Sequence, residues 1–117
     1  MRCIPRSLLI HNAEICSVLN EDCFGKRMLS EPVKLKFIRI DREDSDEKTG
    51  HAFKCRGKAV LIYDALSSLP VKFEFEVGQE VLFSSTVYRV MLVRKLYDKR
   101  KLHHIEAELE EIQEGLL

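Results

Sequence analysis

The order of apolar and polar residues in the second half of the chain predicts antiparallel β-strands. From residue 71 to residue 77 the two kinds alternate strictly, which is the period-two pattern of a half-buried strand. Residues 81–83 and 87–93 are more continuously apolar, as in strands that are covered on both faces. Residues 102–109 supply a further strand. We therefore expect these segments to form a meander of neighbouring strands.

The connections in this half are less regular than the strands. Ser84 and Ser85 stand where Asn-Gly or Asp-Gly would best tolerate positive φ, so we expect a longer turn or a bulge rather than an ideal two-residue turn. Residues 98–101 form a basic loop. Apolar residues between 105 and 112 also have helical spacing, so residues 106–113 are compatible with either a strand end or a helix.

The first half of the chain begins with a β-compatible run at residues 4–11, in which Pro5 removes one ladder hydrogen bond. We expect an edge-like first strand there, joined in a hairpin to residues 14–19. Residues 20–25 then form a loop that carries Phe24.

The middle of the chain contains two further strands separated by a charged segment. Alternation over residues 33–41 predicts one strand, and residues 58–63 predict the other. Residues 41–57 have too few apolar side chains to offset the entropy of ordering them, so we expect a mobile loop. Residues 64–70 form a short irregular connection with room for one helical turn.

Many short strands with weak helix signals predict an all-β fold, a small antiparallel β-barrel or sandwich. The length of 117 residues fits a single domain, residues 1–117, with a flexible tail at residues 110–117. Closure of the barrel or contact with neighbouring subunits must protect the strand edges. The expected core residues are Leu9, Leu35, Phe37, Val60, Ile62, Phe75, Val81, Phe83, Val87, Val90, Leu92 and Ile105.

Charge and cysteine content exclude several classes of protein. Nineteen basic and nineteen acidic residues give a net charge of zero. The surface as a whole is therefore not a non-specific binder of polyanions such as nucleic acid. The four cysteines lack a C-x-x-C pair and are expected to be reduced thiols; disulfides in an exported particle are the alternative, whose connectivity the spacing does not determine. No apolar run is long enough to span a bilayer, which predicts a soluble protein made in the cytoplasm.

No catalytic, cofactor or metal site is predicted. His103 and His104 lie beside Glu106, but adjacent strand residues face opposite sides of a sheet and would not converge on one ion. The Ser67-Ser68 pair lacks the surroundings of a nucleophile, and turn formation explains it better. The acidic residues 41–46 lack the ordered frame of a calcium loop.

Nucleic-acid binding has partial support in the sequence. The basic run at residues 95–101, interrupted by Tyr97, could contact phosphates. Tyr63 and Tyr88 lie within apolar strand patterns, which favours a place at the edge of the core over a role in base stacking.

A series of short motifs follows in a fixed order along the chain, each weak alone: residues 4–11, Phe24-Gly25, 32–35, 38–40, 61–64, Ser67-Ser68, Phe75, 78–83, 88–90, Leu96-Tyr97 and 103–106. In this order they resemble the minor capsid proteins of tailed bacteriophages and prophages, and beyond them the small β-barrel head-closure, or stopper, proteins. The chain departs from the family at Ser84-Ser85, where Asn-Gly is frequent, and after residue 109.

This resemblance implies a non-enzymatic virion protein at the head-to-tail junction, present in the host cytoplasm during assembly. Its implied partners are copies of itself in a ring, a portal-side connector protein and a tail-side protein, with passing contact to genomic DNA and no membrane. We expect the free protein to be monomeric or weakly associated. The candidate contact residues are Arg42, Glu43, Asp44, Asp46, Glu47 and Lys48 in the charged loop, and Lys95, Lys99, Arg100 and Lys101 in the basic loop.

Two other functions stay open at this stage. A small nucleic-acid-binding barrel requires a continuous basic face with exposed aromatic side chains. A metal-dependent enzyme requires His11, His103 or His104 to converge with a carboxylate in a pocket.

Overall fold

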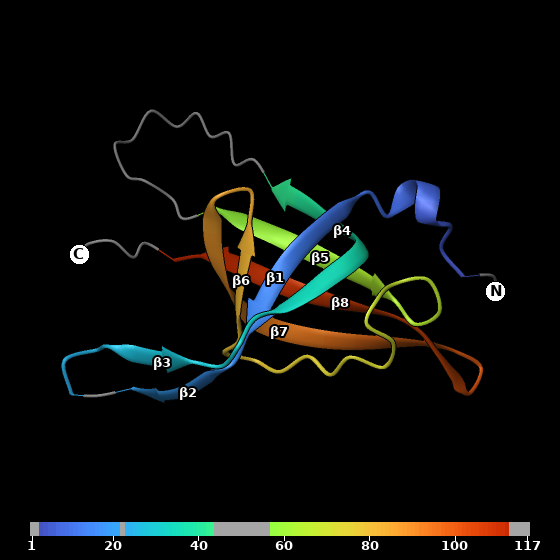
Figure 1. Ribbon diagram of the computed structural model, residues 1–117. Helices are drawn as coiled ribbons and strands as arrows, with labels where there is room; N and C mark the ends of the chain where they lie inside the picture. The colour runs from blue at the N-terminus through green and yellow to red at the C-terminus, as the bar shows by residue number, and fades with distance from the viewer. Residues whose placement is uncertain (1–2, 22, 44–56, 113–117) are drawn as a thin grey trace.

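The computed structural model describes residues 3–21, 23–43 and 57–112. Six strands form a closed antiparallel barrel in the order β1-β4-β5-β8-β7-β6, and β6 pairs back with β1 (Figure 1). This confirms the predicted all-β fold and shows that, of the two predicted forms, it is the barrel and not the sandwich. The strands are β1 His11–Cys16, β4 Val33–Glu43, β5 Lys58–Asp64, β6 Glu80–Phe83, β7 Thr86–Asp98 and β8 Lys101–Glu111.

Two elements lie outside the barrel. Strands β2 (Val18–Glu21) and β3 (Arg27–Leu29) form a separate two-stranded sheet that projects from it, and η1 (Arg6–Leu8) is one turn of 3₁₀ helix before β1 (Figure 1). The expected first strand at residues 4–11 is therefore wrong, because only His11 belongs to a strand and Arg6–Leu8 form the turn. The expected hairpin between residues 4–11 and 14–19 is also wrong, since β1 pairs with β4 and β6.

The segment with the clearest alternation, residues 71–77, is not a strand. It is an irregular segment that buries Phe75 and half-buries Phe73. The two rings meet edge-on with their centroids 4.8 Å apart. The Tyr63 hydroxyl accepts a hydrogen bond from the Phe73 backbone N–H at 3.1 Å and donates one to the Pro70 carbonyl. Alternating burial thus arises here without ladder hydrogen bonds.

The turn between β6 and β7 also differs from its prediction. Phe83 pairs directly with Thr86, which leaves only Ser84 and Ser85 in the turn, with φ of 56° and 67°. Positive φ at both central residues is the signature of a type I′ turn, whose twist matches that of the flanking strands. A two-residue turn therefore forms although neither residue is glycine.

The C-terminal segment is a strand as far as Glu111, so the helical alternative for residues 106–113 is wrong over its described part. The predicted charged loop begins later than expected, because residues 41–43 continue β4. Its remaining residues up to 56 lie outside the described residues. Of the predicted tail at residues 110–117, Glu110 and Glu111 belong to β8, and Ile112 donates a backbone hydrogen bond to Val87.

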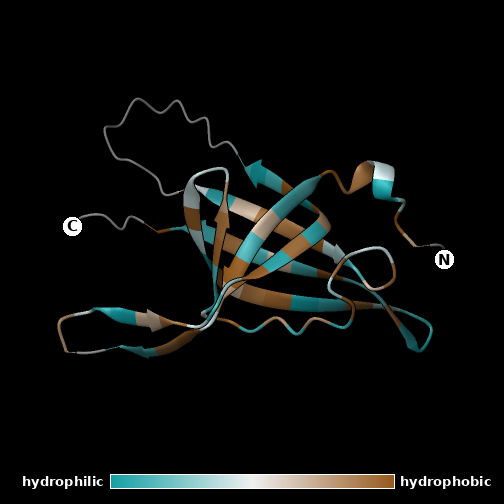
Figure 2. Cartoon of the chain, viewed as in Figure 1, coloured by the Kyte–Doolittle hydropathy of each residue, from teal (hydrophilic) through white to brown (hydrophobic). Residues whose placement is uncertain are grey.

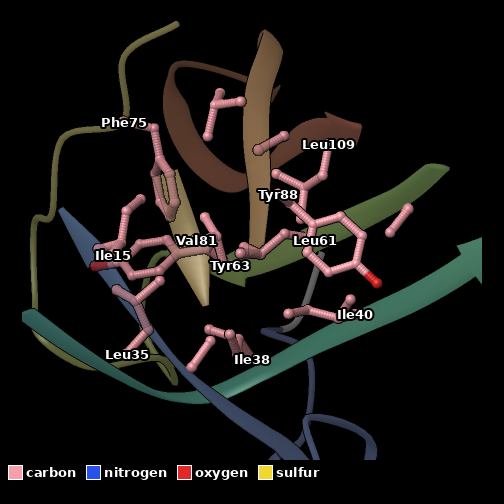
Figure 3. Packing of buried hydrophobic residues seen from close by; sticks show 14 of the residues in the cluster. Ile15, Leu35, Ile38, Ile40, Leu61, Tyr63, Phe75, Val81, Tyr88 and Leu109 are labelled. Atoms are coloured by element: carbon pink, nitrogen blue, oxygen red, sulfur yellow. The ribbon is translucent and has the colours of Figure 1, made fainter. Parts of the chain in front are cut away.

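A tightly packed core fills the barrel, and Figure 3 shows its side chains meeting from all six strands. Seven of the expected core residues are buried as predicted or pack against the core, namely Leu9, Leu35, Phe75, Val81, Phe83, Val90 and Ile105. For β5 the prediction of which side chains face inward is wrong by one residue. Ala59, Leu61 and Tyr63 face inward, whereas the predicted core residues Val60 and Ile62 are half-buried. A one-residue shift exchanges the two faces of a strand.

Bulges explain most of the remaining errors in the core. In β4, Ala13 pairs with Leu35 and His11 with Ile38, so β4 has one extra residue and Phe37 adopts φ of 56°. Ile38 is buried while Phe37 is only half-buried, its ring under the Arg6 guanidinium at 3.9 Å. An extra residue reverses the inward phase of the strand.

The second bulge lies in β7. Val90 pairs with Leu109 and Leu92 with Glu108, so the intervening residue is extra. Tyr88 and Val90 are buried before the bulge, and Val93 packs against the core after it. Leu92 is therefore 40% exposed, contrary to its prediction. Val87 lies before the bulge, next to the inward Tyr88 and hence on the opposite face, and is only half-buried, which is also contrary to its prediction.

Candidate functional site

The described residues of the predicted charged loop lie at one end of the β4–β5 pair. Arg42 pairs with Ala59 and Glu43 with Lys58. The Arg42 guanidinium lies 5.4 Å from the centre of the Phe83 ring. Four predicted contact residues, Asp44, Asp46, Glu47 and Lys48, fall outside the described residues, and the predicted mobility of this loop stays a prediction.

The predicted basic loop is the tip of a long hairpin. Asp98 pairs with Lys101, so only Lys99, with φ of 62°, and Arg100 form the turn between β7 and β8. All three cationic side chains of the tip are exposed. Because Lys58 lies beside Glu110 while Asp64 lies beside His104, this tip and the Glu43 end of β4 are at opposite ends of the β5–β8 ladder.

Below the tip, the hairpin does not present a continuous basic face. The Arg94 guanidinium lies 2.8 Å from Glu108 and 4.0 Å from Glu106, and the Lys95 ammonium lies 3.9 Å from Glu74. These carboxylates offset the positive charge along the strands. Tyr97 is 58% exposed, but Tyr63 and Tyr88 are buried in the barrel and cannot stack on bases. The arrangement thus weakens the case for a nucleic-acid-binding face.

A hollow of about 580 Å³ lies beside the tip. Cys3, Leu66 and Leu102 line it together with His103 and residues 98–101, and the Leu66 side chain is 76% exposed. Sequence reasoning did not find this hollow, because it joins the N-terminal segment, the connection after β5 and the β7–β8 hairpin.

The walls of the hollow are held by Asp64, which is fully buried. One of its carboxylate oxygens accepts a hydrogen bond from the Ile4 N–H at 3.0 Å, and the other accepts from Leu66 and Ser67 at 3.0 and 2.9 Å. The Ser67 hydroxyl donates to the Ile4 carbonyl at 2.8 Å. The Asp64 and Ser67 motif therefore fixes the N-terminal segment to the connection after β5.

The projecting β2–β3 hairpin is the second feature that sequence reasoning missed. Its exposed apolar side chains are Leu19, Phe24, Met28 and Leu29, and Phe24 is 89% exposed. Figure 2 shows hydrophobic colour at the end of this hairpin and hydrophilic colour at the β7–β8 tip, on the other side of the molecule. The lack of clear alternation in residues 18–29 was the available signal, since these apolar residues fit no core strand.

A buried ion pair fixes this hairpin to the barrel. Arg27 of β3 contacts Glu80 of β6 through two nitrogens, with Nε–Oε2 at 2.5 Å and Nη2–Oε1 at 3.2 Å. The Glu80 side chain is 4% exposed, and Arg89 approaches it at 3.9 Å. Burial raises the pKa of the neighbouring Cys16 thiol, and the negative charge of Glu80 raises it further. The described cysteines Cys3, Cys16 and Cys23 are free thiols.

The three histidines in the described part of the chain, His11, His103 and His104, are not gathered at one point with carboxylates or thiols. His103 and His104 are expected from the sequence to face opposite sides of the sheet, but their rings meet, with Nδ1 of one 2.7 Å from Nδ1 of the other, at a register shift in the β7–β8 ladder. His104 Nε2 is 3.2 Å from Glu106, whereas His11 accepts a hydrogen bond from the Ile40 N–H at 3.0 Å. Within residues 3–21, 23–43 and 57–112, no three His, Cys, Asp or Glu residues are placed to hold a metal ion.

A closed antiparallel barrel with two projecting hairpins, whose exposed tips differ in polarity, is a form suited to contact with other proteins. The family model described as minor capsid protein matches residues 5–109. Since this match spans most of the chain, the protein belongs to the minor capsid protein family, and its role is that of a structural phage protein in the virion. A comparison with curated proteins gave no match. Within the described part of the chain, no helix has the length and apolarity to cross a membrane.

Proposed function

We propose that this minor capsid protein is a head-closure connector, a non-enzymatic ring component that joins portal-side and tail-side proteins and helps to retain packaged DNA. The observation that carries the proposal is the pair of unlike projections on one rigid barrel. The β2–β3 hairpin presents apolar side chains, and the β7–β8 hairpin presents a cationic tip (Figures 1 and 2). Such an adaptor can contact two different neighbours at once.

The barrel itself supports this role because it provides a fixed frame. All six of its strands are paired on both sides, so the barrel has no open edge for uncontrolled strand addition. The segments that we propose to contact partner proteins are therefore the two hairpins and the connection after β4. The cationic tip fits a position near DNA phosphates, where a few positive charges attract the polymer without binding a particular sequence.

The proposal is tested by complementation of a phage that lacks this gene, scored by electron microscopy for DNA-filled heads and attached tails. Without the protein we expect tail-less heads that have lost DNA. Particles with normal tails and full heads in its absence would refute the connector role.

A variant of the tip separates this role from folding. Replacing Lys99 and Arg100, the two turn residues of the tip, by Glu should leave the melting temperature nearly unchanged but reduce the yield of tailed particles. The matched control replaces two exposed lysines of β4, Lys34 and Lys36, by Glu. Equal loss of particles in both variants would show that overall charge, and not the tip, is responsible.

A further inference from the structure

We infer that the hollow beside the β7–β8 tip binds an acidic segment of a partner protein that carries large apolar side chains. This inference rests on the proposed function and deepens it, because it names the chemistry of the neighbour that this hairpin contacts. One juxtaposition carries it: an exposed apolar wall lies directly beside cationic side chains whose charge is not neutralised by the described part of the chain.

Three parts of the chain meet at the hollow. The N-terminal segment contributes Cys3, the connection after β5 contributes Leu66, and the β7–β8 hairpin contributes residues 98–103. All three gather at the same end of the molecule (Figure 1). The volume of about 580 Å³ lies within the range of about 300–1,000 Å³ typical of binding pockets. The hollow is therefore large enough to receive apolar side chains of a bound segment.

The apolar wall is held in place before anything binds. Leu66 is 76% exposed, yet its backbone N–H donates to the buried Asp64 carboxylate at 3.0 Å. The same carboxylate accepts the Ile4 N–H at 3.0 Å, which fixes the residue next to Cys3. The second apolar wall, Leu102, packs partly against the barrel core. Because these walls are ordered in advance, docking loses less conformational entropy than docking to a flexible loop would.

The rim of the hollow is cationic. Residues 98–101 are all described and contain three basic residues and one acidic residue, a net charge of +2. The two basic residues nearer the barrel, Arg94 and Lys95, lie beside carboxylates. The three basic residues of the rim, in contrast, form no ion pair with any residue of the described ranges. Cations of this kind at the edge of a hollow favour an anionic occupant.

The apolar wall favours a protein segment over DNA as this occupant. Phosphates would satisfy the rim but leave Leu66 exposed, and no Phe, Tyr or Trp is among the described residues that line the hollow, so a base has no aromatic ring to stack on there. An acidic segment with large apolar side chains satisfies both parts, with carboxylates at the rim and apolar groups against Leu66 and Leu102. Attraction of DNA to the tip needs only exposed charge and does not require the hollow.

Cys3 provides a direct test, because it is exposed and lines the hollow. In the full-length chain with Cys16, Cys23 and Cys55 replaced by Ser, it is the sole thiol. Its rate of alkylation by iodoacetamide is followed by mass spectrometry. The probes are short synthetic peptides in which Asp or Glu alternates with Leu or Phe. We expect these peptides to slow alkylation in a saturable way, relative to the rate without peptide.

A variant of the wall tests the apolar part of the contact. Leu66→Ser should raise the peptide concentration for half-protection about tenfold or more, because buried apolar anchors dominate such contacts. Leu66 is exposed in the free protein, so the melting temperature should stay nearly unchanged. The matched control is Val77→Ser, which removes another exposed apolar side chain outside the hollow and should leave protection unchanged.

A variant of the rim tests the charged part. Lys99→Glu with Arg100→Glu should weaken protection about tenfold or more, since acidic peptides are then repelled. Each variant is compared with its own rate without peptide, because the rim charge also affects the thiol. The matched control is Lys34→Glu with Lys36→Glu, which reverses two exposed charges of β4 outside the hollow and should leave protection nearly unchanged.

Four outcomes would overturn the inference. Equal protection by acidic peptides in which Ser replaces Leu and Phe, or by a short DNA duplex, would identify a general polyanion site. Protection that rises with protein concentration in the absence of peptide would identify a second copy as the occupant. Equal effects of the hollow variants and their controls would place the contact elsewhere. No protection at about 1 mM peptide would leave no contact of useful affinity.

The outcome is separable from that of the complementation experiment. If the peptides give no protection but heads without the protein still lose their tails, the connector role stands and this site falls. If the peptides protect Cys3 but particles are normal without the protein, the site stands and the connector role falls.

Discussion

Arg27 and Glu80, 53 residues apart in the sequence, form a two-point ion pair that joins the projecting hairpin to the barrel. The arginine side chain is 25% exposed and the carboxylate is 4% exposed. A paired contact between guanidinium and carboxylate fixes direction as well as distance. The orientation of the hairpin therefore depends on a residue of β6.

Arg27→Met should destabilise the fold by about 2–4 kcal/mol, because it leaves the buried Glu80 carboxylate with only the more distant Arg89. Urea unfolding measures the loss. The double variant Arg27→Met, Glu80→Met should recover much of it, since no buried charge is then left without a close partner. Arg94→Ala is the control, because its ion pairs are exposed and should be worth about 1 kcal/mol or less. A loss of the same size in both single variants would contradict this account.

Tyr63 should make the fold sensitive to alkaline pH. Burial raises the pKa of its hydroxyl above the ordinary value, and the charges of Asp64 and Glu74 add to this, against the lowering effect of backbone hydrogen bonds from Phe73 and Lys72. The pKa is then higher in the folded than in the unfolded chain. Its contribution to stability is complete below the unfolded value of about 10 and is lost as pH rises through the folded value.

The measurement is the urea midpoint as a function of pH from about 8 to about 11. Tyr63→Phe should lower stability at neutral pH by about 1–2 kcal/mol, through loss of the contacts with Pro70 and Phe73, and should flatten the alkaline decline. Tyr97→Phe changes an exposed side chain and should alter neither the stability at neutral pH nor its decline at alkaline pH. An unchanged alkaline slope in Tyr63→Phe would refute the assignment.

The bulge in β7 predicts opposite outcomes for two residues that the sequence pattern places together in the core. Val90→Asp should prevent cooperative unfolding, because Val90 is fully buried and an unpaired charge there is costly. Leu92→Asp should change stability by about 1 kcal/mol or less, since Leu92 is 40% exposed. Circular dichroism with thermal melting distinguishes them, and unfolding by Leu92→Asp would refute the bulged register.

The turn between β6 and β7 offers a stabilising substitution. Ser84→Asn with Ser85→Gly should raise stability by about 0.5–1 kcal/mol, because these residues adopt positive φ at less cost than serine. The thermal midpoint should rise. Ser85→Val should lower it, since a β-branched residue is strained at φ of 67°. A fall in the midpoint with the Asn-Gly pair would show that the turn is not of type I′.

The sequence by itself determined the class of fold and the approximate positions of most barrel strands. Alternation in β4 and the apolar runs of β5 to β8 leave no long amphipathic helix, so only a sheet can bury these side chains. The ordered motifs likewise led to the family that the match over residues 5–109 establishes. The cationic tip was also visible in the sequence, because three of its four residues are basic.

Only the tertiary structure decided which face of each strand is inside. The extra residues near Phe37 and Met91 reverse the inward phase, and a period-two pattern has no means of marking where the partner strand lacks a residue. The hollow beside Leu66 and the ion pair of Arg27 with Glu80 were also decided only by the tertiary structure, because each joins segments that are distant in sequence. The hollow follows from pairing of β5 with β8 and from the contact of Ile4 with Asp64. The ion pair joins β3 to β6, which closes the barrel against β1.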